Sequence, residues 1–439
     1  MGTATILAMG QHDHPAPRSA AMQELCARGL VEQCSDFEAL DKAFDSGMQT
    51  FYVGYDPTAP SLHVGHLVPL MVMRLLQRHG HRPLCVVGGA TARVGDPSGK
   101  TETRKILDND RIALNTKRLK HQLSQFVHFD KGAPNDALML DNADWLLEFK
   151  YIDFLREIGR HFSVNRMVAV KTYRERLENE QPLSFLEFNY QLLQAYDFMH
   201  LNREHRCTLQ VGGSDQWGNM VAGVELIRRT RHASGENKDG KRDTAHALTL
   251  PLLTTADGKK MGKTEKGAVW LEADRLSPYD YYQYWYNTAD QDVPKLLRTF
   301  TDLNSDQIEA LCAAEGAARS EAKHRLAYET TRLLHGDVEA EKARRASEQA
   351  FGAGTDWSAL PCIEIPVKSI TLGDLLIHDK VAAFKSKRLA RPSVQAGSVE
   401  INDASVTDIN TTYTQQDCGE SGLRLKASKK KKFRIRLGS

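Results

Sequence analysis

Residues 50–76 read TFYVGYDPTAPSLHVGHLVPLMVMRLL and set the architecture expected for the first half of the chain. The opening run, residues 50–54, is rich in β-branched and aromatic residues, which is typical of a strand. A proline-containing turn follows, and the apolar stretch from Leu67 to Leu76 predicts a helix. The N–H groups and the positive dipole end at the start of such a helix are suited to bind a phosphate.

Two short segments carry the candidate nucleotide site. The first, HVGH at residues 63–66, stands at the predicted helix start, where Gly65 would let a ligand lie against the backbone and the imidazoles would donate hydrogen bonds to phosphoryl oxygens. The second, KMGKT at residues 260–264, stands in a polar loop, residues 257–267, suited to clamp a phosphate. Taken singly, each segment is explained better as a helix cap or a solvated turn. Their occurrence together favours a triphosphate site.

These two segments resemble the HIGH and KMSKS signatures of the class I aminoacyl-tRNA synthetases. The resemblance covers the chain from about Met22 to the C-terminus, and it is specific for bacterial-type tyrosyl-tRNA synthetases. It implies activation of L-tyrosine with ATP to tyrosyl-adenylate, then transfer of the tyrosyl group to the 3′-terminal adenosine of tRNA(Tyr). The further motifs that carry it read YVGYDPT at 52–58, GGAT at 88–91, GDPSGK at 95–100, QAYD at 194–197 and GGSDQWGN at 212–219.

Length and composition are those of a soluble globular enzyme. With 439 residues, 41% of them hydrophobic and 26% charged, the chain is too long for one compact core, so two or three domains are expected. Because no apolar run has the length of a membrane span and no secretory signal is visible at the N-terminus, we expect a cytoplasmic protein without a membrane partner. The seven cysteines are scattered without a C-x-x-C pair, which favours reduced thiols and no structural zinc site.

Strand-like runs alternate with helical stretches in the first part of the chain, at residues 50–54, 84–87, 137–140 and 208–211. This order predicts an α/β fold with a Rossmann-like parallel sheet covered by helices on both faces. Ligands of such sheets bind outside the carboxyl ends of the strands. The predicted boundaries are 1–20 for a disordered extension, 21–276 for the catalytic domain with a connective insertion, 277–351 for a helical domain on the anticodon side, 352–368 for a linker and 369–439 for a small α+β module.

The terminal module resembles a small RNA-binding fold shared with a ribosomal small-subunit protein. Every charged residue from Arg424 to Arg436 is basic, which is suited to a polyanionic partner. Two residues depart from the family pattern. Pro392 is expected to break or kink a helix, and Asp403 replaces a turn glycine. The residues expected to bind RNA are Lys385, Lys387, Arg388 and Arg391.

A second helix carries the candidate amino-acid site. Ser184 and Glu187 form a capping-box pattern that predicts a helix running to about residue 199, with Phe185 in its buried apolar stripe. Polar side chains on this helix, spaced by four and three, share one face, which from the residues alone is more simply a solvent face. The resemblance instead implies a tyrosine site. Tyr52 and Asp197 would bind the phenolic hydroxyl, Asp96, Tyr190 and Gln194 the α-ammonium group, and Gln216 would lie near the carboxylate.

The resemblance also implies the ATP site and the transition-state contacts. No side chain needs to act as a covalent nucleophile, because the tyrosine carboxylate attacks ATP. Mg²⁺ is expected on the phosphates, although no carboxylate cage for a metal is visible, and family members are homodimers. The catalytic residues implied are Thr58, His63, His66, Lys100, Arg104, Lys260 and Lys263. The ATP contacts implied are Gly54, Asp56, His63, Gly65, His66, Asn142, Gly213, Asp215, Lys260 and Lys263.

Three other interpretations fit the sequence less well. A P-loop kinase fails on spacing, because the leading glycine of a Walker A motif would fall where Val94 and Asp257 stand. A tryptophan-charging relative is disfavoured because Tyr52 and Asp197 suit a phenol. A synthetase-derived RNA-binding or splicing protein would not need the intact catalytic motifs, although an added RNA role stays open.

Overall fold

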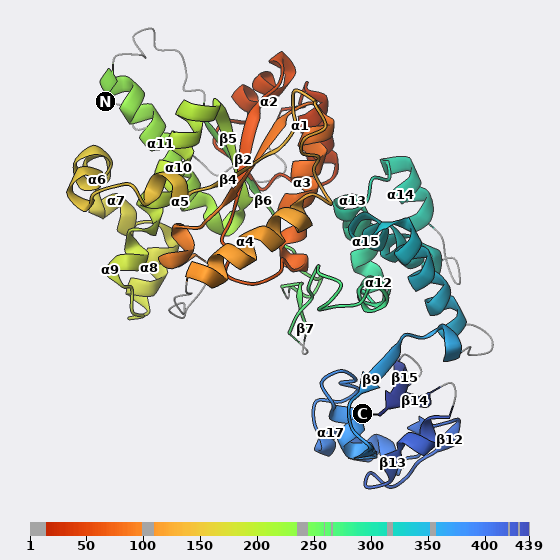
Figure 1. The fold of residues 1–439 in the computed structure, drawn as a ribbon. Helices are drawn as coiled ribbons and strands as arrows, with labels where there is room; N and C mark the ends of the chain where they lie inside the picture. Colours follow the sequence, from red (N-terminus) through yellow and green to blue (C-terminus); the bar gives the residue numbers. More distant parts are fainter. Residues whose placement is uncertain are drawn as a thin grey trace. The chain divides into compact units, whose positions relative to one another are not determined.

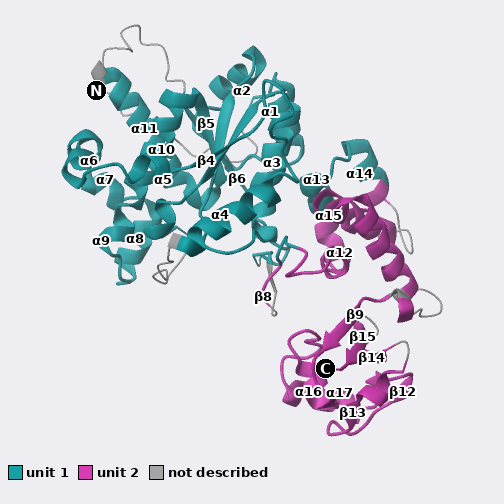
Figure 2. Ribbon diagram, viewed as in Figure 1, with its two compact units in different colours: residues 1–262, 270–272, 294–310 teal, residues 263–269, 273–293, 311–439 magenta. Residues whose placement is uncertain are grey.

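The computed structural model describes residues 15–98, 109–234, 245–258, 260–264, 267–313, 319–351, 357–419, 422–428 and 431–438. Figure 1 shows the order of its helices and strands along the chain. The chain divides into two compact units, coloured separately in Figure 2. The first unit comprises residues 1–262, 270–272 and 294–310, and the second comprises 263–269, 273–293 and 311–439. The domain boundaries expected from the sequence stay a prediction.

A six-stranded sheet forms the centre of the described part of the first unit. Its order is β1-β6-β5-β2-β3-β4, and all neighbouring pairs are parallel except β1 with β6. The α/β class and the four predicted strands are therefore confirmed. The strands are β1 (Gln33–Cys34), β2 (Thr50–Tyr55), β3 (Arg82–Val87), β4 (Leu138–Asp141), β5 (Cys207–Gly213) and β6 (His246–Leu250).

The two strands that the sequence did not predict, β1 and β6, lie together at one edge of the sheet. All five residues of β6 are buried, so its sequence lacks the alternation that identifies a half-exposed strand. Strand β1 is only two residues long and pairs antiparallel with Leu248 and Thr249. Neither pattern is distinctive in the sequence alone.

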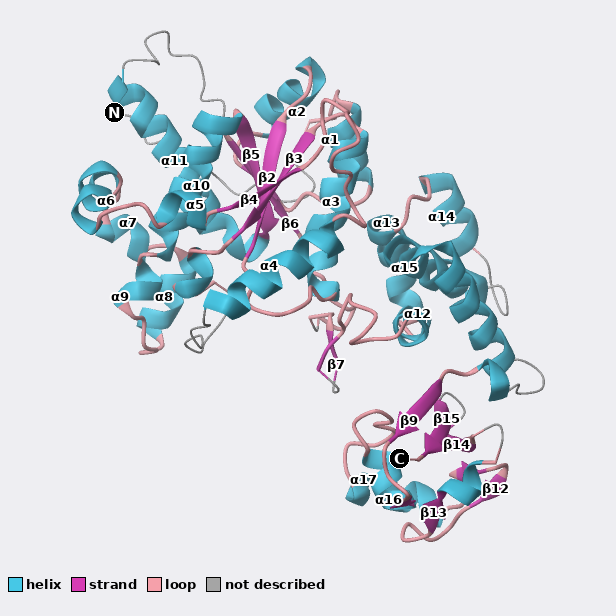
Figure 3. Ribbon diagram, viewed as in Figure 1, coloured by secondary structure: helices cyan, strands magenta, loops and turns pink. Residues whose placement is uncertain are grey.

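Helices lie on both sides of this sheet (Figure 3). Helix α10 packs over the sheet centre, where Phe198 and Leu201 join Tyr52 and Leu84 in one apolar cluster. The helices of this part are α1 (Ala20–Ala27), α2 (Phe37–Ser46), α3 (Leu67–Arg78), α4 (Asn109–Leu123), α5 (Ala143–Leu146), α6 (Tyr151–Glu157), α7 (Val164–Val168), α8 (Lys171–Glu178), α9 (Phe185–Phe188), α10 (Tyr190–His205) and α11 (Trp217–Ser234).

The segment after β2 folds as the sequence predicts, from strand through turn to helix. A short 3-10 turn, η1 (Val64–His66), leads into α3. The apolar run becomes a buried face, with Leu70, Met73 and Leu76 inaccessible to solvent. Burial of these side chains holds the helix start at the carboxyl end of β2.

The helix predicted from Ser184 to about residue 199 is in fact two helices. Ser184 and Glu187 form the predicted capping box, but it opens the short α9. Asn189 then interrupts the helix with a side-chain bond to the Phe185 carbonyl, 2.6 Å long, and α10 follows. The burial expected of Phe185 is also wrong, because its side chain is 68% exposed.

The predicted helical region is divided between the two units, and its helices α12 and α15 belong to the second. Helix α12 (Pro278–Tyr286) places Tyr281, Tyr282 and Trp285 in a buried contact with α15 (Arg319–Phe351). Helix α15 is not continuous in its backbone, because Gly336 has a φ of 84°. The short strands β7 (Lys263–Thr264) and β8 (Gly267–Ala268) also belong to the second unit. The helices α13 (Val293–Phe300) and α14 (Ser305–Cys312) lie mostly within residues 294–310, which belong to the first unit.

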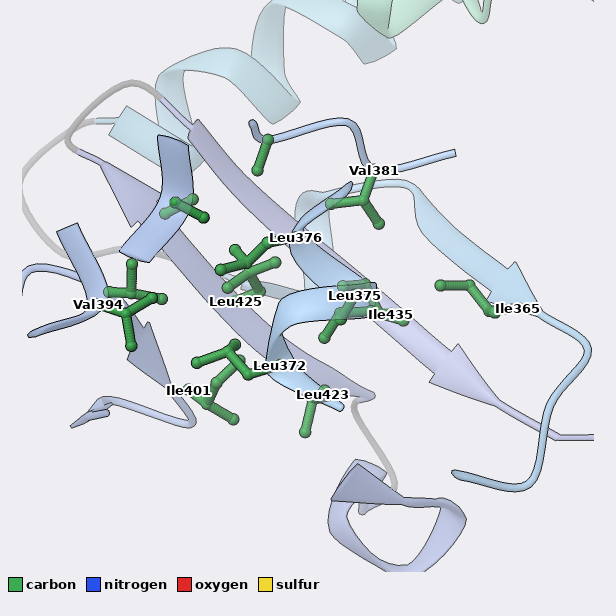
Figure 4. Packing of buried hydrophobic residues seen from close by; sticks show 14 of the residues in the cluster. Ile365, Leu372, Leu375, Leu376, Val381, Val394, Ile401, Leu423, Leu425 and Ile435 are labelled. Atoms are coloured by element: carbon green, nitrogen blue, oxygen red, sulfur yellow. The ribbon is translucent and has the colours of Figure 1, made fainter. Parts of the chain in front are cut away.

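The C-terminal module has its own apolar core beneath a five-stranded sheet, as Figure 4 shows. Leu372 and Leu375 of α16 pack there with Leu425 and Ile435 of the sheet. An α+β module is therefore confirmed. Its elements are β9 (Cys362–Ile365), β10 (Ser369–Thr371), α16 (Leu372–Ile377), α17 (Lys387–Gln395), β11 (Glu400–Ile401), β12 (Ala404–Ser405), β13 (Thr412–Thr414), β14 (Leu423–Ser428) and β15 (Lys431–Leu437).

Three details of this module differ from the sequence expectation. Part of the segment predicted as a linker forms β9, which pairs in parallel with β15. Pro392 does not break α17, which continues to Gln395 and whose carbonyl at Pro392 accepts from Ala396. Asp403 follows Asn402 in a hairpin turn, and both have positive φ, a conformation that Asn and Asp tolerate better than most residues.

Candidate active site

The predicted site residues gather where β2, β3, β4 and β5 end. The loop after β2 carries Asp56 and Thr58, and the loop after β3 carries Asp96. Asn142 follows β4, and Asp215 follows β5 in the 3-10 turn η4 (Ser214–Gln216). Parallel strands bring these four ends to one edge of the sheet, which is where α/β folds bind ligands.

A buried polar pair lies on the inner side of this edge. Asp197 of α10 is 4% exposed and accepts hydrogen bonds from Asn142 Nδ2 at 3.0 Å and from Trp145 Nε1 at 2.7 Å. Tyr52 of β2 is 2% exposed, and its hydroxyl has no hydrogen-bond partner among the described residues. A buried hydroxyl without a partner is costly, so this atom is suited to bind a polar group of a ligand.

The electrostatics of this pair follow from burial. Burial raises the pKa of Asp197 to about 7, although the hydrogen bonds from Asn142 and Trp145 lower it. Burial also raises the pKa of the Tyr52 hydroxyl well above its ordinary range, and the nearby Asp197 adds to this rise. Tyr52 therefore stays neutral at physiological pH and can donate or accept a hydrogen bond.

The structure places Asn142 beside Asp197. Its side chain is 1% exposed, its Nδ2 donates to Thr91 Oγ1 and Asp197, and its Oδ1 accepts from the Ala90 N–H at 2.8 Å. All its polar atoms are thus used within the protein. The ATP-ribose contact implied for Asn142 stays a prediction, and what the geometry shows is that Asn142 holds Asp197.

A second cluster, the α-group cluster, contains Asp96, Gln194 and Gln216, which the resemblance implies for the α-ammonium and carboxylate groups. Ser98 and Asn219 join it through hydrogen bonds. Gln216 Nε2 donates to Asp96 Oδ2 at 2.8 Å, and the Ser98 N–H donates to Asp96 Oδ1 at 2.9 Å. Gln194 Oε1 accepts from Asn219 Nδ2 at 3.2 Å. Separate elements therefore bring together one carboxylate and the amides, a set that matches an ammonium group and a carboxylate.

Asp56 bonds to two residues of the site, Thr91 and Tyr190. Its Oδ1 accepts from Thr91 Oγ1 at 2.9 Å, and its Oδ2 accepts from the Tyr190 hydroxyl at 3.2 Å. A Cβ at Gly88 would stand 2.1 Å from Asp56 Oδ1, so the glycine makes room for this carboxylate. Tyr190 thus contacts the turn after β2, at the boundary of the implied tyrosine site.

The two histidines of the HVGH segment lie side by side at the start of α3, with their rings tilted by 36°. Their ring centroids are 4.0 Å apart. His63 Nδ1 accepts from the Gly65 N–H at 3.0 Å, and His66 Nδ1 accepts from the His63 N–H at 3.2 Å. A neutral imidazole that accepts at Nδ1 carries its proton at Nε2, so each ring is oriented as an Nε2–H donor.

The KMGKT segment meets this helix start. Residues 254 and 260 form an isolated β-bridge, and the Met261 N–H donates to the Leu253 carbonyl at 2.8 Å. Gly262, with a φ of 92°, lies against Gly65 so closely that a Cβ on it would stand 2.8 Å from the Gly65 nitrogen. Lys260 is exposed. Lys100, Arg104 and the Lys263 side chain lie outside the described residues.

The remaining nucleotide-side residues line the open edge. Gly54, Thr58 and Asp215 are exposed, as contacts to a bound nucleotide require. A Cβ at Gly213 would stand 2.6 Å from Asp215 Oδ1, so a side chain there would displace that carboxylate. The geometry brings together most residues that the sequence predicted, but their roles stay predictions.

Comparison with known proteins now gives the family. Residues 46–352 match the model described as tRNA synthetases class I (W and Y), and residues 354–434 match the Tyrosine--tRNA ligase SYY-like C-terminal domain. The chain belongs to the tyrosine–tRNA ligase family. It is 48% identical to the tyrosine–tRNA ligase of Caulobacter sp. (strain K31), over 94% of this chain and 97% of that protein. It is 46% identical to the ligase of Clostridium tetani, over 93% of this chain and 97% of that protein.

Solved structures agree with this membership of the tyrosine–tRNA ligase family. A truncated mitochondrial tyrosyl-tRNA synthetase of Coccidioides posadasii has a TM-score of 0.66 and 32% identity, over 75% of this chain and 92% of that one. The truncated mitochondrial tyrosyl-tRNA synthetase of Aspergillus nidulans has a TM-score of 0.67 and 30% identity, over 76% of this chain and 95% of that one. An archaeal tryptophanyl-tRNA synthetase from Aeropyrum pernix, 14% identical with a TM-score of 0.52, shares the fold.

The described ranges also bear on metal binding, membrane spans and cysteine chemistry. Among the described residues, no group of three or more His, Cys, Asp or Glu side chains could hold a metal ion. None of the described helices is both long and apolar enough to cross a membrane. All seven cysteines lie in described residues, and each is a free thiol, as predicted.

Sequence reasoning missed three side chains that organise the ligase site. Trp145 and Thr91 bind Asp197 and Asp56 respectively, and Asn219 bonds within the α-group cluster. Asn219 and Thr91 stand inside the GGSDQWGN and GGAT motifs, which pointed to them without giving a role. Trp145 carried no such signal, because an indole near a helix start is usually a core residue.

The candidate RNA-binding residues lie on one short stretch of the C-terminal module. Lys385, Lys387, Arg388 and Arg391 are exposed, and three of them belong to α17. Lys387 also bonds to Asp374 at 2.7 Å, so part of its charge is offset. Exposed cations on one helix are suited to phosphate contacts.

Proposed function

We propose that the chain ligates L-tyrosine to tRNA(Tyr) in two steps, with tyrosyl-adenylate as the intermediate. The observation that carries the choice of amino acid is the Tyr52 hydroxyl beside Asp197. Tyrosine would donate its phenolic proton to Asp197 and accept from Tyr52. Phenylalanine would leave the buried Tyr52 hydroxyl without a partner and would give Asp197 no phenolic donor, which disfavours it more than the loss of a single contact would. The tyrosine enzyme is itself the standard illustration of this rule.

In the first step the tyrosine carboxylate attacks the α-phosphorus of ATP. A new C–O–P bond forms, the bond between the α- and β-phosphates breaks, and pyrophosphate leaves with its electron pair. Asp96, Gln194 and Gln216 would hold the amino acid in place for this attack. Positioning of this kind lowers the barrier without any covalent intermediate on the protein.

Charge that develops on the phosphates would be met by fixed donors. His63 and His66 present their Nε2–H groups, which the backbone bonds at Nδ1 orient in advance. Donors that need no reorganisation are the most effective kind of transition-state stabilisation. Thr58 and Lys260 would contribute from neighbouring loops. The nucleotide ribose and its surroundings would be held by Asp215, Gly213 and Gly54.

Mg²⁺ would bind only together with the ATP phosphates. The described residues supply no carboxylate cage, so phosphate oxygens and water would be its main ligands. No step of the mechanism is assigned to the metal. ATP is a substrate and not a resident cofactor.

In the second step the ribose of the terminal adenosine attacks the adenylate carbonyl, and AMP leaves. A cavity of about 690 Å³ between α7 and α11 is suited to receive the acceptor end of the RNA. Arg166, Arg228 and Arg229 line it, against one carboxylate, Glu225. Gly218, in the first turn of α11 and two residues after η4, also lines the cavity. The basic C-terminal module would bind the rest of the tRNA.

We further propose a homodimer that acts in the cytoplasm. On α9, Phe185 and Leu186 are 68% and 46% exposed, and Leu177 on α8 is 53% exposed. The buried Arg176–Glu187 ion pair, 3.3 Å long, joins α8 to α9. An apolar patch of this kind marks an interaction surface, and a two-fold axis would pair it with itself.

Amino-acid-dependent exchange of pyrophosphate into ATP tests the proposed activity. We expect exchange with tyrosine and none above background with phenylalanine or tryptophan at the same concentration. Equal exchange with tryptophan would favour the tryptophan-charging alternative. Exchange without any amino acid would favour another nucleotide enzyme, and no exchange at all would favour a protein that only binds RNA.

A further inference from the structure

Asn219, in the first turn of α11, bonds to three residues of the α-group cluster with one side-chain nitrogen. Its Nδ2 lies 3.2 Å from Gln194 Oε1, 3.4 Å from Gln216 Oε1 and 3.4 Å from Ser98 Oγ. The residue is 4% exposed. These partners come from α10, from η4 and from the loop after β3, so one amide joins all three elements.

We propose that Asn219 is a positioning residue that sets which end of the Gln194 and Gln216 amides faces the bound amino acid. This inference rests on the proposed tyrosine activation and deepens it. The amide nitrogen of Asn219 can only donate, so the groups that approach it must present oxygen. The Oε1 atoms of Gln194 and Gln216 both do so.

The orientation of Gln216 has a direct consequence for the site. With its Oε1 held by Asn219, its Nε2 faces Asp96 Oδ2 at 2.8 Å. A reversed amide would place oxygen against the Asp96 carboxylate, which is repulsive. The same Nε2 also lies 3.4 Å from Asp215 Oδ2. Asn219 therefore keeps the amide nitrogen of Gln216 toward the carboxylates, and this holds Asp96, the acceptor that the α-ammonium group needs, in place.

Ser98 connects Asn219 to Asp96 through hydrogen bonds. Its N–H donates to Asp96 Oδ1 at 2.9 Å, and its hydroxyl lies against Asn219 Nδ2. Asp96 and Ser98 are each 8% exposed, so water has little access to replace these bonds. Loss of the Asn219 donor should thus disturb the α-group contacts while leaving Tyr52 and Asp197 as they are.

The experiment compares Asn219→Asp and Asn219→Ala with the wild-type enzyme in tyrosine-dependent pyrophosphate exchange. Asn219→Asp keeps the shape but removes the donor. We expect the KM for tyrosine to rise about 10-fold to 50-fold in both variants, as loss of two or three neutral hydrogen bonds implies, with the KM for ATP changed less than about twofold. An Asn219→Asp enzyme with a wild-type KM for tyrosine would overturn the proposal.

A phenol without α-groups separates positioning from general damage. The competitive inhibition constant of 4-propylphenol should stay within about twofold of wild type, because this ligand uses only Tyr52 and Asp197. Equal weakening of 4-propylphenol and tyrosine would overturn the proposal in favour of a structural role. The matched control is Asn202→Ala, another buried asparagine with a bond to the Cys207 carbonyl, which should leave both constants unchanged.

A double-mutant cycle keeps the inference testable if Asn219→Asp does not fold. In a Gln194→Ala and Gln216→Ala background, Asn219→Ala should add less than about twofold to the KM for tyrosine, because the groups it orients are gone. A full, independent effect there would contradict the proposal. A wild-type enzyme without tyrosine-dependent exchange would instead refute the proposed function itself.

Discussion

Gly262 packs against the backbone of Gly65: a Cβ on Gly262 would stand 2.8 Å from the Gly65 nitrogen. This close approach joins the two signature segments of the family. We expect Gly262→Ala to lower kcat of tyrosine-dependent exchange by about tenfold or more, because the loop and the helix start must separate to admit the methyl group. Steady-state kinetics with purified protein measures this.

Gly258→Ala is the matched control for that variant. Gly258 has a φ of 80°, close to the 92° of Gly262, but no atom lies within 4 Å of the position that a Cβ would occupy there. Both variants therefore strain the same loop backbone, and only one of them collides with Gly65. If Gly258→Ala reduced activity as much as Gly262→Ala, backbone strain and not the collision would explain the reduction.

The sequence was informative about backbone elements and much less so about side-chain partners. The run from β2 into α3 was predictable because strand propensity, turn residues and helical periodicity all agree within residues 50–76. The hydrogen-bond partners of Asp197 were not predictable, since Asn142 and Trp145 stand 55 and 52 residues away along the chain. Only the approach of β4 to α10 in the folded chain brings them together.

Local patterns also failed where two rules compete. The capping box at Ser184 was recognised, but the side chain of Asn189 binds a backbone carbonyl and ends α9 after one turn. Pro392 removes one backbone donor, yet Ala390 and Val394 on the same helix are fully buried and hold α17 against the module core. Tertiary packing outweighs the local preference there.

The titration of Asp197 should appear in the pH dependence of tyrosine use. Burial raises its pKa to about 7, so below that pH the free enzyme holds a neutral acid, which accepts the phenolic proton less well than a carboxylate does. We therefore expect kcat/KM for tyrosine to rise as pH increases through about 7. This rise in kcat/KM should be missing from the pH profile of Asp197→Asn. An identical rise in that variant would mean that another group titrates.

His63 should act on the transition state more than on ground-state binding. We expect His63→Ala to lower kcat by about 100-fold, as loss of one oriented donor to developing charge implies, with the Kd of tyrosine changed less than about twofold. Thr58→Ala should also lower kcat, by a smaller factor, and leave the Kd of tyrosine nearly unchanged. Equilibrium dialysis with tyrosine and pre-steady-state adenylate formation separate the two effects. A decrease confined to tyrosine affinity would contradict the assigned role.

Phe185 should control the oligomeric state. Phe185→Asp places a charge in the proposed two-fold contact, so we expect the variant to sediment as a monomer at concentrations where the wild-type protein sediments as a dimer. Val338→Asp is the control, because Val338 on α15 is also 68% exposed but lies outside the proposed patch. A monomeric wild type, or dissociation by both variants alike, would count against this surface.

The cations of α17 should affect tRNA and leave adenylate formation unchanged. We expect the double change Arg388→Ala and Arg391→Ala to raise the KM for tRNA about tenfold at moderate salt, because each exposed arginine that binds a phosphate contributes to counterion release. Tyrosine-dependent pyrophosphate exchange needs no RNA and should stay at the wild-type rate. The slope of log K against log salt should become shallower by about one for each arginine removed, whereas Lys42→Ala on α2 should not change it. An unchanged slope in the double variant would place the RNA elsewhere on the module.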